Sequence, residues 1–389
     1  MIFTVKREPF LKALQTAGKA VPSRTTKDIV KNVKLDARTN AITLIGTDTE
    51  IGIRVEVSDV VRSDAGVCLL PTNRVLQVLN EFGDGDVDFE VGSDAVWIRG
   101  GGPGTKAEFR FPTEDPDGFP DVKGFTEDKF FTVKAGDLRR LIRRTLFATD
   151  TESTRVALGG IQVEFNIDKR VNFVATDSRR LSVDVAPFDA TGGPQAPAVA
   201  PVIPAKAMKL IAATIEESGD VQVAFNGNGV AVRSGLVTIT SQLVQGRFPD
   251  WRKVMPGNPQ KTIDFVVGPL LSAIRQAMVM RSESSRAVEF AFAKGTLKLT
   301  SSTEPMPMPK EEKKLERTLL SDGETLVKLP IGYDGEDISI DFDSVYFSDV
   351  LKVLDSSSQV QFKLISREDP GLLVAGDYKY IVMPISRDR

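Results

Sequence analysis

The chain has 389 residues, 41% hydrophobic and 26% charged, with a formal net charge of −3, which is typical of a soluble globular protein with two or three domains. It has no histidine and one cysteine, Cys68. This excludes a Ser-His-Asp triad, a Cys-His dyad, a histidine-ligated metal site and an internal disulfide. No apolar run approaches the roughly 18 residues of a membrane span. Because the N-terminus opens directly into a strand-like pattern, we expect a cytoplasmic protein without a signal peptide.

A strand followed by an amphipathic helix occurs three times along the chain. The strands are Phe3-Thr4-Val5-Lys6, Phe131-Thr132-Val133-Lys134 and Ile263-Asp264-Phe265-Val266. Their spacing is about 130 residues, far more than the roughly 20 to 50 of a solenoid unit, so the repeat is a whole domain. The pattern predicts three similar domains, at residues 1–127, 128–259 and 260–389.

Further landmarks recur in the same order. Thr47-Asp48 and Thr176-Asp177 each precede an alternating strand, and a second amphipathic helix is expected around 75–79, 207–211 and 350–354. Short turns separate the strands, so we expect antiparallel sheets. The predicted fold class is α+β, with two helices on one face of the sheets in each domain.

Two segments interrupt the regular pattern. The stretch from Pro187 to Pro204 is rich in Pro, Ala and Gly, but the repeat continues through it, so we interpret it as a loop inside the second domain. The third copy has an insertion from about Pro305 to Asp337 that contains a highly charged run. We expect this insertion to be a solvated excursion, and its role stays open.

A predicted helix that begins near Gly136 concentrates arginine. At roughly 100° per residue its apolar side chains fall on one face and its arginines on the other. The arginines are Arg139, Arg140, Arg143 and Arg144. An exposed arginine face favours phosphate contacts that carry no sequence information, and a plain solvated face is the alternative.

Other candidate motifs are weak. Gly100-Gly101-Gly102-Pro103-Gly104 is followed by Thr105-Lys106, but the Gly-Lys-Ser/Thr order of a phosphate loop is missing, so a hairpin loop is expected. Carboxylates such as Asp84, Asp86 and Asp88 are scattered on turns rather than paired. We therefore predict no catalytic residue, no metal site and no cofactor.

These features, in this order, resemble the bacterial sliding clamps, the β subunits of DNA polymerase III, over essentially the full length. The motifs that carry the resemblance are the start Met1-Ile2-Phe3-Thr4-Val5, Ala175-Thr176-Asp177 with Arg180-Leu181, Phe248-Pro249-Asp250 and Val382-Met383-Pro384. The resemblance implies the DNA-clamp fold and a head-to-tail homodimer that closes a six-domain ring. It further implies a non-catalytic, nucleoid-associated processivity factor that encircles duplex DNA irrespective of sequence.

The resemblance also implies particular site residues. Arg24 and Arg74 would contact DNA beside the arginine helix, and Phe109 and Phe111 would pack against Val279 and Met280 of the partner subunit. A pocket would bind a short Gln-Leu-x-Leu-Phe-like segment of DNA polymerases, the clamp loader and repair proteins. Its walls would be Leu158, Thr176, Ser178, Arg179, Arg180, Leu181, Pro249, Val254, Tyr346, Val382, Met383, Pro384 and Ile385.

The chain departs from the family pattern in the pocket. Ser178-Arg179 stands where Gly-His is usual, Lys253 stands where Arg is usual, and Asp343 stands where Asn is common. Ser285 replaces an aromatic residue found near the pocket in some members. The preferred peptide therefore stays open. A specialised paralogue, such as an antibiotic-resistant copy, is an alternative function, and a carboxylate-based nucleic-acid hydrolase is a less favoured one.

Overall fold

The computed structural model describes most of the chain and divides it into two compact units. Residues 40, 151, 153, 194–196, 258, 281–285, 303–322 and 386–389 are outside the described part, and Ser285 and most of the predicted insertion are among them. The expectation of a solvated excursion is wrong for Glu324–Pro330, which forms a strand of the third copy paired with the preceding strand. Unit 1 contains Met1–Arg139, Ile167–Arg170 and Ala186–Gln245; unit 2 contains Arg140–Asn166, Val171–Val185 and Gly246–Arg389. No helix within the described residues is long and apolar enough to cross a bilayer.

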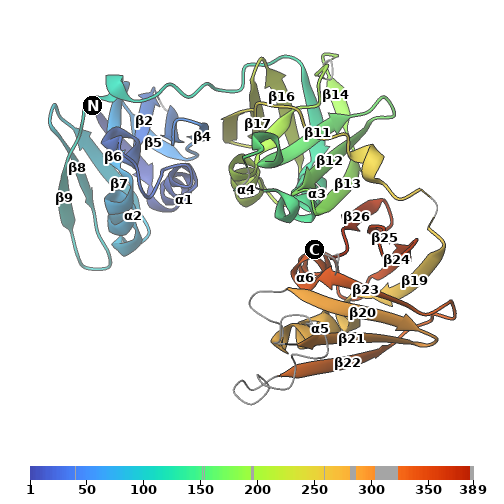
Figure 1. Ribbon diagram of the computed structural model, residues 1–389. Helices are drawn as coiled ribbons and strands as arrows, with labels where there is room; N and C mark the ends of the chain where they lie inside the picture. Colours follow the sequence, from blue (N-terminus) through green and yellow to red (C-terminus); the bar gives the residue numbers. More distant parts are fainter. Residues whose placement is uncertain are drawn as a thin grey trace. The chain divides into compact units, whose positions relative to one another are not determined.

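One order of elements occurs three times (Figure 1). The first copy contains β1 (Ile2–Lys6), α1 (Arg7–Gly18), β2 (Asn32–Arg38), β3 (Ala41–Thr47), β4 (Ile51–Glu56), β5 (Val60–Ser63), β6 (Gly66–Pro71), α2 (Thr72–Glu81), β7 (Asp86–Val91), β8 (Ala95–Gly100) and β9 (Ala107–Pro112). The second contains β10 (Phe130–Lys134), α3 (Ala135–Thr145), β11 (Gly160–Phe165), β12 (Arg170–Thr176), β13 (Arg180–Pro187), β14 (Asp189–Thr191), β15 (Val202–Pro204), α4 (Ala205–Thr214), β16 (Asp220–Asn226), β17 (Gly229–Ser234) and β18 (Val237–Gln242).

The third copy follows the same plan, except that no strand of its described residues corresponds to β5 and β14. It contains β19 (Lys261–Val266), α5 (Val267–Ala277), β20 (Ala287–Ala293), β21 (Thr296–Ser302), β22 (Glu324–Pro330), β23 (Ile338–Asp343), α6 (Ser344–Lys352), β24 (Gln359–Leu364), β25 (Gly371–Ala375) and β26 (Tyr378–Val382). The paired strands run antiparallel, and each copy has two α-helices. The α+β prediction is therefore confirmed.

Alternating strands and amphipathic helices bury their apolar sides against each other. In the first copy Phe3 of β1 and Phe10 of α1 are fully buried and both lie against Phe89 of β7, with ring centroids 4.5 and 5.1 Å from that ring. In the third copy Phe290 and Phe347 are packed in the same manner, 4.7 Å apart. Aromatic pairs of this geometry contribute about 0.5–1.5 kcal/mol beyond their buried area.

Strand pairing joins consecutive copies of the repeat. In unit 1, β4 of the first copy pairs with β18 of the second, with Ile53 opposite Ile239. In unit 2, β13 of the second copy pairs with β26 of the third, with Leu181 opposite Ile381. By their position in the repeat, β4 and β13 correspond to β22, and β18 and β26 correspond to β9. The strands β22 and β9 each lie at the edge of a sheet.

The glycine-rich segment after β8 is a hairpin loop, as predicted. Gly100 at the end of β8 is opposite Ala107 at the start of β9, and the loop between them contains Gly101 to Lys106. Gly102 donates its backbone N–H to the Thr105 hydroxyl at 3.0 Å, which closes the turn locally.

Candidate functional sites

The turn between β12 and β13 is held by side chains of its own sequence. Thr176 Oγ1 donates to the Arg180 carbonyl at 2.6 Å and accepts the Ser178 N–H at 3.1 Å. Asp177 Oδ1 accepts the N–H groups of Arg179 and Arg180, each at 2.9 Å. Asp and Thr close such turns because their short side chains reach the backbone two or three residues on. The turn places Ser178 in the left-handed region, at φ +77°.

Arg180 is the centre of this site. Its Nε donates to Asp177 and one Nη to Asp349 of α6, both at 2.9 Å, while the other Nη donates to the Phe147 carbonyl at 2.7 Å. The guanidinium lies over the ring of Tyr346, 4.4 Å from its centroid. Its side chain is only 11% exposed, and each of its three guanidinium nitrogens donates to a protein acceptor.

The electrostatics of this site follow from burial and charge. Burial by itself would lower the pKa of Arg180, but Tyr380, Asp349 and Asp177 outweigh burial and raise it. Burial raises the pKa of Tyr346, and Asp177 and Asp343 add to that effect. The site therefore contains a permanent, well-held cation next to a neutral phenol.

The C-terminal segment runs alongside the turn. Val382 is opposite Arg180 in the strand pair, and Met383 donates its N–H to the Arg179 carbonyl at 2.9 Å. Pro384 forms a bridge with Phe342, and Ile385 donates to the Asp341 carbonyl at 2.8 Å. These contacts bring together most of the predicted pocket residues: Thr176, Ser178, Arg179, Arg180, Leu181, Tyr346, Val382, Met383, Pro384 and Ile385.

The remaining pocket residues are placed less directly. Leu158 is 1% exposed, at the end of the short 3-10 helix Val156–Leu158. Pro249 and Val254 are exposed, around the 3-10 helix Trp251–Val254. Met383 and Val254 are 42% and 49% exposed. Exposed apolar side chains of this kind suit a surface that binds apolar anchors.

Sequence reasoning missed two residues that hold Arg180. Asp349 and Phe147 contact it through a carboxylate and a backbone carbonyl. Neither carries a signal of its own, because Asp349 lies on an ordinary amphipathic helix and Phe147 is one more apolar residue after α3. The Arg180 guanidinium also lies over the Phe147 ring, 5.4 Å from its centroid. Only the pairing of β13 with β26 brings α6 to the turn.

The arginine face of α3 differs from the expectation. The predicted inner face is buried, with Leu138, Leu141, Ile142 and Thr145 at most 3% exposed. Of the four arginines, however, only Arg143 is exposed, and the other three are half-buried. Arg139 donates to the Ile215 carbonyl at 2.6 Å.

Arg140 and Arg144 enclose a buried carboxylate. Asp184 on β13 is fully buried, and its Oδ2 lies 2.6 Å from Arg140 and 3.5 Å from Arg144. Arg144 also lies over the Tyr378 ring, 5.2 Å from the centroid. The prediction that these two side chains are exposed is wrong. The carboxylate buried on β13 requires positively charged partners, and Arg140 and Arg144 of α3 supply them.

The other residues predicted for DNA and dimer contacts lie at the surface. Arg24 and Arg74 are exposed. Arg74, Phe109 and Phe111 line a cavity of about 350 Å³ between α2 and β9. Phe109 is 37% exposed and Phe111 is 9% exposed, while Val279 and Met280 of unit 2 are 73% and 40% exposed. Within the described residues, no cluster of three or more His, Cys, Asp or Glu is placed to hold a metal ion.

Three family models match consecutive parts of the chain. They describe the N-terminal, central and C-terminal domains of the DNA polymerase III beta subunit and match residues 1–123, 132–250 and 252–386. A beta sliding clamp of Proteus mirabilis is 27% identical over 391 residues, covering 99% of this chain and 100% of that protein. One from Pseudomonas aeruginosa is 28% identical over 392 residues, with the same coverage.

Solved structures agree with the family models. The crystal structure of a sliding clamp from Pseudomonas aeruginosa bound to griselimycin matches with a TM-score of 0.86 and 26% identity, over 99% of both chains. A sliding clamp from Bacillus subtilis has the same fold, with a TM-score of 0.87 at 23% identity over 99% of both chains. Together with the repeat, its strand pairing and its conserved order of turns, these matches place the chain in the DNA polymerase III beta subunit family.

Proposed function

We propose that this protein is a DNA sliding clamp, a processivity factor that encircles duplex DNA and tethers the replicative polymerase. The matches to the family over the full length support this function. A ring acts as a topological tether, because a polymerase bound to it rebinds its template at high effective concentration. The clamp needs no catalysis and no cofactor for this task, and it works with DNA in the cytoplasm, at the nucleoid.

The observation that carries the proposal is the strand pairing between repeats. The pairs β4–β18 and β13–β26 leave one equivalent pair, β22 and β9, without a partner on one side among the residues that the structure describes. An unpaired edge invites another strand, so β22 of one subunit would pair with β9 of the next. A head-to-tail contact that closes makes a ring. We propose a homodimer with three domains per subunit, at residues 1–127, 128–259 and 260–389.

Side chains at both edges support this contact. Leu326 on β22 is 59% exposed and Phe109 on β9 is 37% exposed. The cavity beside Phe109 and Phe111 offers room for an apolar side chain, and Val279 and Met280 of the partner subunit are exposed enough to supply one. Apolar anchors that fill pockets dominate the binding energy of protein interfaces.

The DNA contacts would be made by arginines irrespective of sequence. Arg24, Arg74 and Arg143 are exposed and can reach phosphates directly. Arg139, Arg140 and Arg144 would add positive potential beside Arg143 on the same helix, since their guanidinium groups are half-buried and bound to protein acceptors. Binding of this kind weakens as salt rises, because each phosphate contact releases counterions.

We propose a groove around Arg180 that receives short peptides of DNA polymerases, the clamp loader and repair proteins. The exposed apolar side chain of Met383 and the ring of Tyr346 would hold hydrophobic anchors of a Gln-Leu-x-Leu-Phe-like segment. Titration of such a labelled peptide tests this. Replacing Met383 by Asp should weaken binding at least tenfold, and Ile167→Asp, a change at a fully exposed turn residue, should not. Unchanged affinity for the Met383 variant would refute the groove.

Two measurements test the clamp itself. Light scattering should give twice the chain mass of 42.4 kDa, and the loaded protein should stay on nicked circular DNA but leave it when the circle is cut. Leu326→Lys and Phe109→Lys should each produce monomers, because an edge charge opposes strand addition, while Ile167→Lys should leave the dimer intact. A dimer unaffected by both edge changes, or equal retention on cut DNA, would refute the ring.

A further inference from the structure

The turn of the proposed peptide groove occurs a second time, in unit 1. Thr47 Oγ1 donates to the Ile51 carbonyl at 2.8 Å and accepts the Thr49 N–H at 3.0 Å. Asp48 Oδ1 accepts the N–H groups of Glu50 and Ile51 at 2.9 and 2.8 Å. Thr49 lies in the left-handed region at φ +83°. Each bond has a counterpart in the Thr176 to Arg180 turn.

The strand beside this turn is also equivalent. Ser241 of β18 is opposite Ile51, as Val382 of β26 is opposite Arg180. Gln242 donates its N–H to the Glu50 carbonyl at 3.3 Å, the counterpart of the bond from Met383 to Arg179. A left-handed threonine or serine costs about 1–3 kcal/mol. The protein therefore maintains the same strained turn at both junctions between repeats.

The two turns differ in the pair of residues that links each turn to the neighbouring helix. Arg180 and Asp349 form an ion pair beside the second turn. Ile51 stands at the position of Arg180. Leu210 stands at the position of Asp349, since each is the sixth residue of its helix, α4 or α6. The ion pair is thus replaced by two aliphatic side chains, 3% and 9% exposed.

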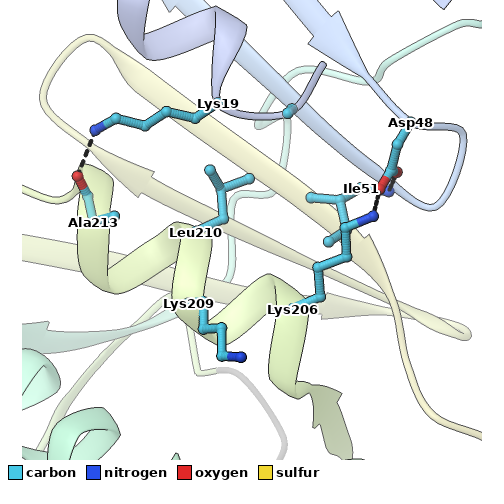
Figure 2. Close-up of a pocket in the computed structure, with 8 residues that line it drawn as sticks. Lys19, Asp48, Ile51, Lys206, Lys209, Leu210 and Ala213 are labelled. Carbon is cyan, nitrogen blue, oxygen red and sulfur yellow. Dashed lines mark hydrogen bonds and ion pairs between the residues drawn. The ribbon is translucent and has the colours of Figure 1, made fainter. Parts of the chain in front are cut away.

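A cavity of about 280 Å³ opens at this aliphatic pair. Its lining consists of Lys19, Ala20, Asp48, Ile51, Lys206, Lys209, Leu210 and Ala213, and we call it the lysine pocket. Figure 2 shows Leu210 between the two lysines that reach across from opposite sides: Lys206 toward Asp48, and Lys19 toward Ala213. The floor is apolar and the rim carries ammonium groups.

The rim is net positive. Three lysines face a single aspartate, and Lys206 is bound to it. Burial by itself would raise the pKa of Asp48, but Lys206 and the N–H groups of Ile51 and Glu50 outweigh burial and lower it. The ammonium group of Lys19 donates to the Ala213 carbonyl at 2.6 Å. Lys209 is exposed and has no ion pair or hydrogen bond in the described part of the chain.

We propose that the lysine pocket is a second peptide-docking site, which takes an extended acidic segment of a partner protein with one aliphatic anchor. The anchor would lie on Leu210 and Ile51, and carboxylates on either side of it would pair with Lys19 and Lys209. An acidic peptide fits better than DNA, because its aliphatic side chain can cover the apolar floor of Ile51 and Leu210, which a phosphate backbone would leave exposed to water. The two junctions of one subunit would then select partners of different charge.

Fluorescence anisotropy with the full-length protein tests this. The probes are a labelled Glu-Asp-Leu-Glu-Asp peptide and its neutral counterpart, Gln-Asn-Leu-Gln-Asn. The protein should bind the acidic probe at least tenfold more tightly, and the difference should shrink as salt rises. The pair of changes Lys19→Glu and Lys209→Glu should remove the preference. Lys294→Glu, at an exposed lysine on the β20–β21 hairpin, should change binding less than twofold.

Three results would overturn the proposal. One is the same affinity for both probes at low salt. Another is loss of acidic-probe binding on Met383→Asp, which would assign the probe to the groove around Arg180. The third is a Lys209→Glu variant that binds duplex DNA more weakly but binds the acidic probe as before, because the pocket would then bind phosphates. Leu210→Ala keeps the charges of the rim but removes part of the apolar floor. It should weaken binding of the acidic probe several-fold, because the leucine of the probe loses its contact there.

Discussion

Replacing Asp184 by Asn isolates the contribution of the buried charge beside α3. The two side chains have the same shape, so Oδ1 can still accept the Val185 N–H, bonded at 3.0 Å in the structure. What disappears is the negative charge together with the Oδ2 acceptor that faces Arg140 at 2.6 Å and Arg144 at 3.5 Å, because the amide places an NH₂ donor there. The two arginines, four residues apart on one helix, then repel each other without a counter-ion.

The expected loss of stability is set by burial. Asp184 has a fully buried side chain, while Arg140 and Arg144 are 28% and 20% exposed. Removing one partner of a buried pair costs about 3–5 kcal/mol. Water can still reach both arginines, so we expect the low end, near 3 kcal/mol. For a unit of this size that lowers Tm by about 6–12 °C.

Asp220→Asn is the matched control. Asp220 lies 2.6 Å from Lys134, the same distance as in the buried pair, but these side chains are 54% and 69% exposed. Exposed pairs contribute about 0–1 kcal/mol. Differential scanning calorimetry and urea unfolding of the two variants measure the contrast. If Asp184→Asn destabilised the protein no more than Asp220→Asn, the structural role assigned to Arg140 and Arg144 would be refuted.

The remaining predictions concern α3, the strained turn and the thiol. Arg143→Ala should weaken DNA retention at low salt without changing Tm, while Arg140→Ala should lower Tm by several degrees; the reverse pattern would contradict the assignment of roles. Ser178→Gly should raise the free energy of unfolding by about 0.5–1 kcal/mol by relieving the left-handed φ, and Ser178→Ala, which keeps that strain, should not. Burial raises the pKa of Cys68 from 9.0 to about 12. The thiol should therefore resist a disulfide reagent at pH 8 until urea unfolds the chain. Its contribution to stability should be complete below pH 9 and lost as pH rises toward 12, a decline that Cys68→Ala should reduce.

Much of the fold was predictable because the pattern is local and repeated. Alternation at period two in Phe131 to Lys134 and helical spacing in Leu138 and Leu141 predict a strand and a helix without any knowledge of distant contacts. The turn at Thr176-Asp177 was predictable for the same reason, since its bonds connect residues at most four apart.

The residues of the proposed peptide site were named from the resemblance to the family, but the contacts that hold Arg180 in place were not predicted. Thr176, Arg180 and Met383 were named from sequence motifs, whereas the ion pair of Arg180 with Asp349 spans 169 residues. The periodicity of a sequence cannot predict a contact between residues so far apart in the chain. The lysine pocket was missed for a similar reason: Asp48 and Lys206 are 158 residues apart, and each resembles ordinary surface charge when taken alone.

The repeat, most elements within each copy and the apolar face of each helix follow from the amino-acid sequence alone, because they depend on the order of side chains over a few turns or strands. Tertiary structure decided which charges are available. Arg140 and Arg143 are three residues apart and look alike in the sequence, yet one is bound to a buried carboxylate and the other is exposed. That difference arises because Asp184 of β13 is buried against α3, and a buried carboxylate is stable only when it is paired with nearby cations.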